Sequence, residues 1–211
     1  MAKVPAARPR GINFRHAALG LLMLAACAQI PVYHLGGNAA IDQAWQRHRG
    51  EIDALRRWSL HGRVAVQTPR DGWQAGLQWR QAAEGFSLRI HAPLGQGTYG
   101  LDGDAGGVVL RTPDNKFLTA RDAETLLSEQ LGWTLPVGGL HYWVRGIPDP
   151  EAPVSWLQLD PLGRMIDLEQ SGWRISVLSY GRSGAVDLPL KLSLHSDQLK
   201  LRMVVQSWEM G

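Results

Sequence analysis

The sequence predicts a mainly β fold with some α-helix, in which about nine to eleven short strands form a curved antiparallel sheet or open barrel covered by helices. Hydrophobic residues alternate with a period of two in residues 58–91 and again beyond Pro153. Helical spacing is found before the first of these blocks and again between them. Turn residues separate the expected strands, at Asp71-Gly72, Asp102-Gly103 and Pro113-Asp114-Asn115. Strands joined by such turns favour antiparallel neighbours.

Residues 1–26 have the charge and hydrophobicity pattern of a secretory signal peptide. The leader contains Lys3, Arg8, Arg10 and Arg15 and no acidic residue, and the apolar run 17–26 ends in small side chains. This run is about half the roughly 20 residues that a membrane-spanning helix needs, so we favour a cleaved signal over a permanent span.

The segment Leu24-Ala25-Ala26-Cys27 looks like a lipobox, in which the cysteine thiol accepts a diacylglyceryl group and the freed amine is then acylated. Cys27 is the only cysteine of the chain, so no internal disulfide is possible. The alternative is an unmodified cysteine within an ordinary signal. Ala28 follows, and not the acidic residue that commonly marks retention in the inner membrane of enteric bacteria. We therefore expect an outer-membrane lipoprotein, anchored through Cys27, with its domain facing the periplasm.

Removal of the signal changes the charge balance. The signal holds four of the 22 Lys and Arg and none of the 19 Asp and Glu, so the mature chain has 18 basic and 19 acidic residues. A nucleic-acid partner would need a basic surface on the mature domain, and we expect none. The remaining length suits one domain, so we expect a lipidated N-terminus and tether at 27–37 and a single domain at 38–211.

The first expected element of the domain is an amphipathic helix capped by Asn38, with Ile41, Trp45, Ile52 and Leu55 near one face. Strand patterns follow it, and they return after Pro153. Their alternating apolar positions are Leu60, Val64 and Val66; Trp73, Ala75, Leu77 and Trp79; Phe86, Leu88 and Ile90; Trp173, Ile175 and Val177; Leu188, Leu190, Leu192 and Leu194; and Leu199, Leu201, Met203 and Val205.

A helical insertion is expected between the two strand blocks. Thr119 and Asp122 resemble a capping box, and Gly132 stands where the helix would end. A second short helix is expected from Val137 to Arg145.

The sequence gives no support for an enzyme, a metal site or a cofactor. It contains neither a GxSxG nucleophile motif nor a GxxxxGK[ST] phosphate loop, and the glycines at 95–100 lie in a hairpin context without a following helix. The histidines of the mature chain form neither an HExxH nor an HxH pattern, which makes them poor candidates for metal ligands. They are His34, His48, His61, His91, His141 and His195.

Tryptophan is the aromatic residue in excess, with nine Trp against three Phe and four Tyr. Large apolar rings are ordinary core fillers, and several rigid rings together also suit the wall of a cavity that accepts acyl chains. The sequence leaves both interpretations open. Leu94 is a second unusual feature, because it stands between Pro93 and Gly95 at a strand junction where a polar residue is usual. An exposed leucine at a loop tip would meet a bilayer or a lipid, and the alternative is a leucine folded back on the sheet edge.

The order and spacing of several segments resemble the LolB family of outer-membrane lipoprotein receptors. The segments are the lipobox, WxLxGRVAV, LQWRQ, FSLRIHAPLG, TARDAE, LHYWVRGIP and the tryptophan near the C-terminus. The resemblance covers nearly the whole mature chain. It implies an unclosed antiparallel β-barrel with helices across its mouth, which encloses an apolar cavity.

The resemblance also implies a function and roles for matching residues. A member of this family accepts lipoproteins from the periplasmic carrier LolA and inserts them into the inner leaflet of the outer membrane, so its partners are a LolA-type carrier, acyl chains and outer-membrane phospholipid. Cys27 would carry the anchor, and Pro93, Leu94 and Gly95 would form a membrane-insertion loop. Four tryptophans would surround the acyl-chain cavity of a monomer: Trp79, Trp143, Trp173 and Trp208.

Two other classes of function compete with a receptor. One is a structural or assembly lipoprotein whose Trp-rich sheet is a solid core, and the other is a lipid-modifying enzyme. An interior cavity of several hundred Å³ favours the receptor, and a compact polar cluster around a nucleophile favours the enzyme.

Overall fold

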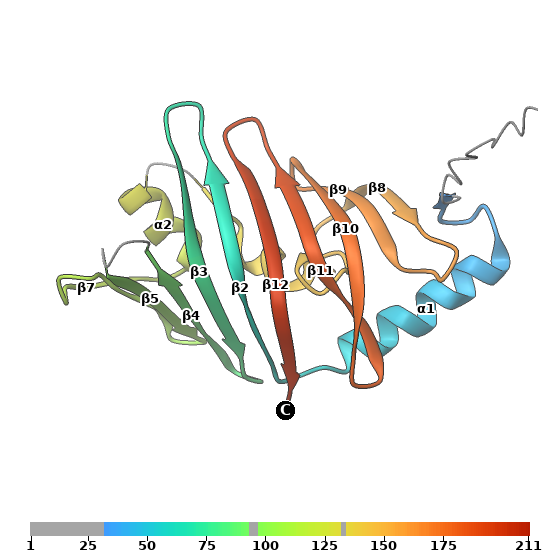
Figure 1. The fold of residues 1–211 in the computed structure, drawn as a ribbon, viewed down its shortest axis with the longest axis horizontal. Coiled ribbons are helices and arrows are strands. Elements are labelled where there is room, and N and C mark those ends of the chain that lie inside the picture. The colour runs from blue at the N-terminus through green and yellow to red at the C-terminus, as the bar shows by residue number, and fades with distance from the viewer. Residues whose placement is uncertain (1–31, 93–96, 132–133) are drawn as a thin grey trace, which may run out of the picture.

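A computed structural model describes residues 32–92, 97–131 and 134–211 of the chain. In these residues it has twelve strands and three helices (Figure 1). In chain order they are β1 (Tyr33–His34), α1 (Ala39–Asp53), β2 (Trp58–Gln67), β3 (Gly72–Gln81), β4 (Gly85–His91), β5 (Thr98–Asp104), β6 (Gly107–Arg111), β7 (Phe117–Ala120), α2 (Ala123–Leu131), α3 (Val137–Trp143), β8 (Val154–Leu159), β9 (Met165–Gln170), β10 (Trp173–Ser183), β11 (Val186–His195) and β12 (Lys200–Met210).

All twelve strands belong to one sheet, in the order β1-β8-β9-β10-β11-β12-β2-β3-β4-β5-β6-β7. Every pair of neighbours in this sheet is antiparallel. The last strand, β12, pairs with β2 along its whole length, from Lys200 opposite Gln67 to Met210 opposite Trp58. This pairing joins the two strand blocks of the sequence. In the described sheet β1 and β7 form opposite ends of the order, so the barrel is unclosed, as predicted.

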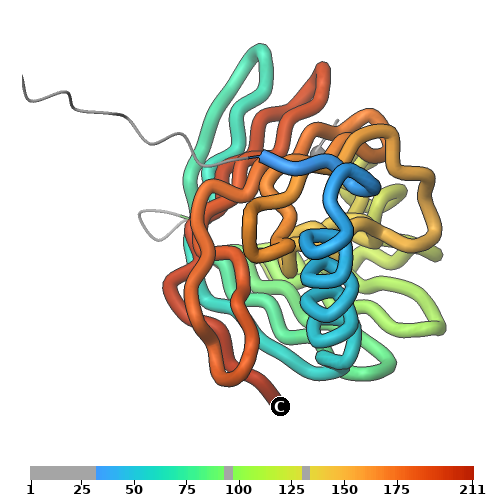
Figure 2. The backbone as a smooth tube through the Cα atoms, turned by 90° about the vertical axis from the view of Figure 1, so that its right-hand side faces the viewer, coloured from blue at the N-terminus to red at the C-terminus, as the bar shows by residue number. Residues whose placement is uncertain are grey.

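The helices cover the concave side of the sheet. Figures 1 and 2 show the sheet curving around α2 and α3, while α1 lies beside the part of the sheet that holds β8 to β11. Each helix buries an apolar stripe against the sheet. The buried helical side chains include Ile41, Trp45 and Ile52 of α1, Leu126 and Leu127 of α2, and Leu140 and Trp143 of α3.

The sequence prediction of α1 is confirmed. Asn38 is its N-cap, with an extended backbone, and its side-chain oxygen accepts hydrogen bonds from the backbone N–H groups of Ala40 (3.0 Å) and Ile41 (3.3 Å). These bonds satisfy two of the donors that a helix start leaves unpaired, which explains why the helix begins there.

Four details of the prediction are wrong. The turn expected at Asp102-Gly103 lies within β5. The described residues contain twelve strands and not nine to eleven, because Tyr33 and His34 of the expected tether pair with β8 as a two-residue strand, too short to show any period. Thr119 lies within β7, so the cap of α2 is Asp122 alone, whose Oδ1 accepts a hydrogen bond from Thr125 N at 2.7 Å. The helix expected at 137–145 ends at Trp143.

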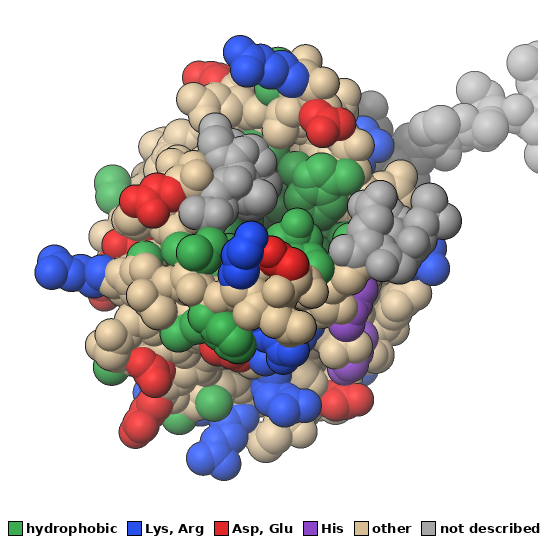
Figure 3. All heavy atoms as spheres, turned by 90° about the vertical axis from the view of Figure 1, so that its left-hand side faces the viewer, with side chains coloured by type: hydrophobic (Ala, Val, Ile, Leu, Met, Phe, Trp, Pro, Cys, Tyr) green, Lys and Arg blue, Asp and Glu red, His purple; other side chains and the backbone are tan. Residues whose placement is uncertain are grey.

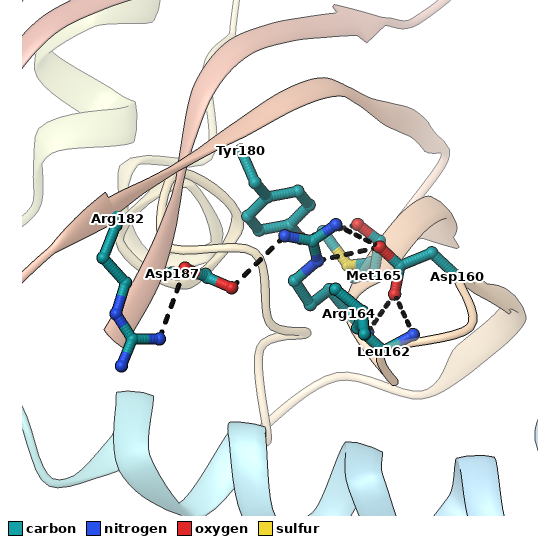
Figure 4. Close-up of polar contacts among 7 residues, drawn as sticks. All are labelled: Asp160, Leu162, Arg164, Met165, Tyr180, Arg182 and Asp187. Carbon is teal, nitrogen blue, oxygen red and sulfur yellow. Dashed lines mark hydrogen bonds and ion pairs between the residues drawn. The ribbon is translucent and has the colours of Figure 1, made fainter. Parts of the chain in front are cut away.

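The turn between β8 and β9 carries a charged cluster that joins it to β10 and β11 (Figure 4). Asp160 Oδ1 accepts hydrogen bonds from the backbone N–H groups of Leu162 and Arg164, and its Oδ2 accepts from Arg164 Nε at 2.8 Å. The Arg164 guanidinium also contacts Asp187 Oδ2 at 3.3 Å and lies over the Tyr180 ring, 4.7 Å from its centroid. A half-buried arginine with two carboxylates and a ring around it holds this turn in one conformation.

Gly163 is the point at which this turn touches α1. It has a φ of +73°, and a Cβ at this position would lie 2.4 Å from the backbone nitrogen of Trp45. Only glycine fits, because a side chain would meet helix backbone that has no freedom to move aside.

We expect Gly163→Ala to destabilise the protein more than Gly172→Ala. Gly172 is a matched control, since it has a similar φ of +76° but nothing within 4 Å of its Cβ position. The control should lose about 1–2 kcal/mol of unfolding free energy for the left-handed backbone, and Gly163→Ala about 1–3 kcal/mol more for the clash. Equilibrium unfolding in urea measures both, and equal losses would show that the turn does not depend on its contact with α1.

Candidate functional site

The concave face of the sheet carries a continuous row of apolar side chains across seven strands, from β12 through β2 to β7. Each member lies directly opposite the next in the register, so neighbouring side chains are in contact distance. The row is Trp208, Leu60, Trp79, Leu88, Leu101, Leu110 and Leu118. All but Leu118 are buried. A row of this kind offers a long apolar surface under the helices.

Part of the concave face is accessible from outside. Trp73 and Ile90 are half-buried although they share the inner side of their strands with buried neighbours, and Tyr99, opposite Ile90, is 39% exposed. Figure 3 shows hydrophobic side chains at a hollow on the side of the molecule that holds β4 to β7 and α2. The apolar interior therefore reaches the surface at this side.

The structure brings the four predicted tryptophans together in two groups. Trp79 and Trp208 both flank Trp58, with ring centroids 5.3 and 5.5 Å from it, and Trp143 packs on Trp173 at 6.2 Å. All four are buried, with exposed fractions from 0 to 9%. They lie on the inner side of the sheet, and the rings pack against one another as in a core, so their role around an acyl-chain cavity stays a prediction.

Two surface pockets lie away from this interior. One of about 490 Å³ lies between α1 and β8 and includes Trp45 and Trp156, and one of about 300 Å³ opens on the outer face among β12, β2, β3 and β4. Of the four predicted tryptophans, Trp79 lines the pocket on the outer face, and the other three line neither pocket. Neither pocket is the interior cavity that the sequence resemblance implies.

Gln170, at the end of β9, fixes α3 and the loop after it. Its Oε1 accepts hydrogen bonds from Trp143 Nε1 (2.8 Å) and Asp149 N (2.9 Å), and its Nε2 donates to the carbonyls of Asp149 and Ala152, both at 2.8 Å. Only 1% of this residue is exposed. Four hydrogen bonds make burial of the amide favourable. Sequence reasoning missed Gln170, because a single glutamine at a strand end carries no pattern.

Arg145 joins the C-terminal ends of two helices. Its Nε donates to the carbonyl of His141 at 3.0 Å, and its Nη1 donates to the carbonyl of Ile52 at 3.1 Å. Its guanidinium lies 5.9 Å from the ring of Trp58 and 5.3 Å from that of Tyr142. Burial lowers the pKa of Arg145 from its usual range. The partial negative charge at helix C-termini explains how this buried cation is tolerated.

His141 completes the cluster around Trp58 and Trp79. The centroid of its ring lies 5.7 Å from that of Trp58 and 6.5 Å from that of Trp79. Its Nδ1 lies 3.1 Å from Gln81 Oε1. Burial, together with the charge of Arg145, lowers the pKa of His141 to about 4, so the ring is neutral at pH 7. Sequence reasoning did not single out Trp58, His141 or Arg145. Only Trp58 carried a signal, because it begins the period of two in β2.

The sequence of residues 56–208 matches the model of the family described as outer membrane lipoprotein LolB. This match spans more than half of the chain and includes both tryptophan groups. The chain belongs to the LolB family.

Similar curated proteins carry the same family name. The chain is 37% identical to the outer-membrane lipoprotein LolB of Nitrosococcus oceani, over 92% of this chain and 95% of the relative. It is 36% identical to LolB of Pseudomonas putida, over 90% of this chain and 92% of the relative, and 35% identical to LolB of Pseudomonas aeruginosa, over 92% and 94%. The resemblance seen in the sequence is confirmed. LolB proteins are outer-membrane lipoproteins and not enzymes.

Solved structures share the fold at very low sequence identity. A LolA superfamily protein from Nitrosomonas europaea aligns with a TM-score of 0.54 and 6% identity, over 81% of this chain and 93% of that one. An outer membrane lipoprotein-sorting protein domain from Vibrio parahaemolyticus aligns with a TM-score of 0.52 and 6% identity, over 80% and 91%. This chain thus shares its overall fold with these two proteins.

Several predicted site residues lie outside the described part of the chain. These are Cys27 and the loop residues Pro93, Leu94 and Gly95. The loop joins β4 to β5, whose inner side chains Ile90 and Tyr99 border the apolar opening, so its sequence position is next to that opening. Among the described residues, no helix is both long and apolar enough to cross a membrane, and no three His, Asp or Glu side chains gather as metal ligands would.

We expect Gln170→Leu to cost about 3 kcal/mol or more of unfolding free energy. The leucine has a similar volume but leaves the buried Trp143 Nε1–H, the Asp149 N–H and two carbonyls without partners. Gln78→Leu, on the exposed side of β3, is the control and should change the stability by less than about 0.5 kcal/mol. Thermal unfolding compares them, and a loss as small as the control's would show that these hydrogen bonds do not hold α3.

Proposed function

We propose that this LolB protein is an outer-membrane lipoprotein receptor. It accepts lipoproteins from a LolA-type periplasmic carrier, holds their acyl chains on the apolar concave face of its sheet, and inserts them into the inner leaflet of the outer membrane. The observation that carries the proposal is the apolar row from Trp208 to Leu118, which leads toward an apolar opening on the side of β4 to β7.

An apolar interior lowers the free-energy barrier to moving acyl chains between proteins. Exposing acyl chains to water costs about 25 cal/mol for each Å² of apolar surface, so passage from one protein interior to another avoids a large barrier. Transfer needs no nucleotide if this interior binds acyl chains more tightly than the carrier does, and the bilayer more tightly still. A LolA superfamily protein has the same fold, which supports the proposal that the carrier holds acyl chains in a similar interior.

Accepting acyl chains requires rearrangement of the interior. The tryptophans that we assign to the cavity, Trp79, Trp143, Trp173 and Trp208, are at most 9% exposed, so entering chains would displace rings or move the helices above them. The helices are joined to the rest of the molecule through few polar groups, such as Gln170 and Arg145. Outward movement of α2 and α3 would open the interior without breaking the sheet.

The anchor and the insertion loop complete the proposal. The acyl chains on Cys27 hold the protein at the outer membrane with its domain in the periplasm, because each buried CH2 contributes about 0.8 kcal/mol. Pro93, Leu94 and Gly95 insert into the inner leaflet beside the opening and give a departing acyl chain an apolar path. The protein acts as a monomer with phospholipid as its second partner.

A structural lipoprotein with a solid core is the second candidate, and the packing of the tryptophan rings favours it. The two functions differ in their response to lipid. A receptor whose rings meet acyl chains shows a saturable change in tryptophan fluorescence when an acyl ligand is added, because the polarity around the rings changes. A solid core gives no saturable change.

We expect Cys27→Ser to give a soluble, folded domain. The anchor is lost with the thiol, whereas the described fold begins after this position, so the unfolding free energy should change by less than about 0.5 kcal/mol. Intact mass and membrane fractionation check the result. A wild-type mature protein without acyl mass, or a variant that stays in the membrane fraction, would remove the basis for the anchor.

The direct test is transfer of cargo from a carrier. LolA loaded with a lipoprotein is mixed with this protein and then with liposomes, and the location of the lipoprotein is followed at each step. The proposal expects cargo to pass to this protein and then to the liposomes. Cargo that stays on LolA would exclude the receptor function.

We expect Leu94→Glu to accept cargo normally and to release it slowly. Burial of a leucine is worth about 1.5–3 kcal/mol, so loss of its insertion should reduce delivery to liposomes by about 10- to 100-fold while the anchor holds the protein in place. Delivery at the parental rate, or failure already at acceptance from LolA, would show that the assigned role of the loop is wrong.

A further inference from the structure

Two buried tryptophans of the interior have indole N–H groups without an acceptor in the described structure. These are Trp58 Nε1 and Trp79 Nε1, in side chains that are 2% and 1% exposed. Other interior tryptophans are satisfied: Trp143 donates to Gln170 Oε1 at 2.8 Å and Trp208 donates to the carbonyl of Pro189 at 2.9 Å. Native proteins rarely leave buried donors unpaired, so two in one cluster require an explanation.

The rings that carry the two donors pack against each other within the apolar row. Trp79 is a member of the row, and Trp58 stands two residues before Leu60 on β2, with the two ring centroids 5.3 Å apart. Half-buried Gln81 and Phe86 lie beside them at the same end of β3 and β4. A molecule on the row would therefore meet both donors near a rim that solvent can reach.

In the described structure neither indole N–H has an acceptor among the surrounding polar groups. Gln81 Oε1 is already a partner of His141, and the carbonyls of His141 and Ile52 accept from Arg145. Arg145 itself is a cation over the Trp58 ring, and none of the ion pairs in the described structure includes it. Two unpaired indole N–H groups and a guanidinium therefore lie in one cluster, and a ligand that satisfies the indoles must supply an acceptor.

We propose that Trp58 and Trp79 form a polar subsite that donates hydrogen bonds to the carbonyl oxygens of acyl chains bound on the apolar row. The inference rests on the proposed function and deepens it. An acylated cysteine carries ester and amide carbonyls at the head of its chains, and hydrocarbon surface alone would leave these acceptors unpaired in the interior. The subsite makes the interior selective for acyl esters and amides over plain hydrocarbon.

The geometry of the row agrees with this arrangement. From Trp79 on β3 to Leu118 on β7 the row spans four strand spacings, or roughly 19 Å at about 4.8 Å each, which is comparable to an extended palmitoyl chain. A carbonyl at the tryptophans thus leaves the chain a continuous apolar path over β4 to β7.

The test compares a dipalmitoyl lipopeptide, which has ester carbonyls, with its dihexadecyl ether analogue, which has chains of the same length without them. Binding to the Cys27→Ser protein is measured by tryptophan fluorescence or calorimetry. One neutral hydrogen bond corresponds to about a fivefold preference for the ester, and two to more. Trp58→Phe and Trp79→Phe should each reduce the preference, and the double variant should abolish it.

Trp208→Phe is the matched control, because it removes a ring from the same cluster whose N–H already has a protein acceptor. It should change both affinities by the same factor and keep the preference for the ester. Infrared spectra of the parent protein with a ¹³C-labelled ester provide a readout that needs no variant, since a hydrogen-bonded carbonyl absorbs at lower wavenumber than in an apolar solvent.

Each outcome decides the proposal. Equal binding of ester and ether by the parent, an unshifted carbonyl band, or a preference that survives in the double variant would overturn the subsite and leave acyl-chain binding intact. If free palmitate bound in a way that depends on the two indoles and the ester did not, the ligand of the subsite would be a carboxylate and not an acyl carbonyl. That result would also overturn the proposal. Failure of both lipopeptides to bind would contradict the proposed function itself.

Discussion

The structure depends on one constraint, which is that its twelve-stranded sheet does not close. In a closed barrel the first and last strands pair with each other, so no strand edge lacks hydrogen bonds, and the side chains of the barrel can fill its interior. Here β1 and β7 stand at opposite ends of the strand order, so the concave face needs a separate cover, and α1, α2 and α3 supply it. The interior is therefore bounded by hydrogen-bonded strands on one side and by packed helices on the other, and only the second boundary moves without breaking a strand ladder.

A small number of polar contacts hold that cover in place. Gln170 binds α3 and its following loop to β9, Arg145 joins the ends of α1 and α3, and the Arg164 cluster holds the β8–β9 turn where Gly163 touches α1. In each case a buried polar group is satisfied by partners from separate elements, so the contacts specify one arrangement of helices on the sheet. In the described structure four buried side-chain polar atoms have no partner, and two of them, the indoles of Trp58 and Trp79, lie in one cluster; the other two are His48 Nε2 and Ser179 Oγ.

Packing of the interior bears directly on function. In the proposed receptor the tryptophan rings fill the space that acyl chains would occupy, so the protein without cargo keeps these rings from water, and the concave face is partly exposed at Trp73, Ile90 and Tyr99. A receptor of this kind exchanges contacts between rings for contacts between rings and lipid. The free energy gained on binding an acyl chain is therefore smaller than the burial of the whole chain would give. Because this gain is modest, the bilayer is the more favourable final environment for the chain.

The sequence by itself determined the class of the fold, the α1 helix with its Asn38 cap, most strands and the family, because period-two and helical patterns, caps and turns are local signals. It also placed Trp79 on an inner strand face, since alternation fixes the face of a residue. Trp208 is out of phase with the alternation of Leu201, Met203 and Val205, and a β-bulge between Val205 and Ser207 brings it opposite Leu60. It did not reveal β1, whose two residues carry no period, nor the roles of Gln170, Arg145 and His141. Those roles arise from contacts between residues up to 93 positions apart, and only the curvature of the sheet and the seating of the helices decided which polar groups would meet and which indoles would have no partner.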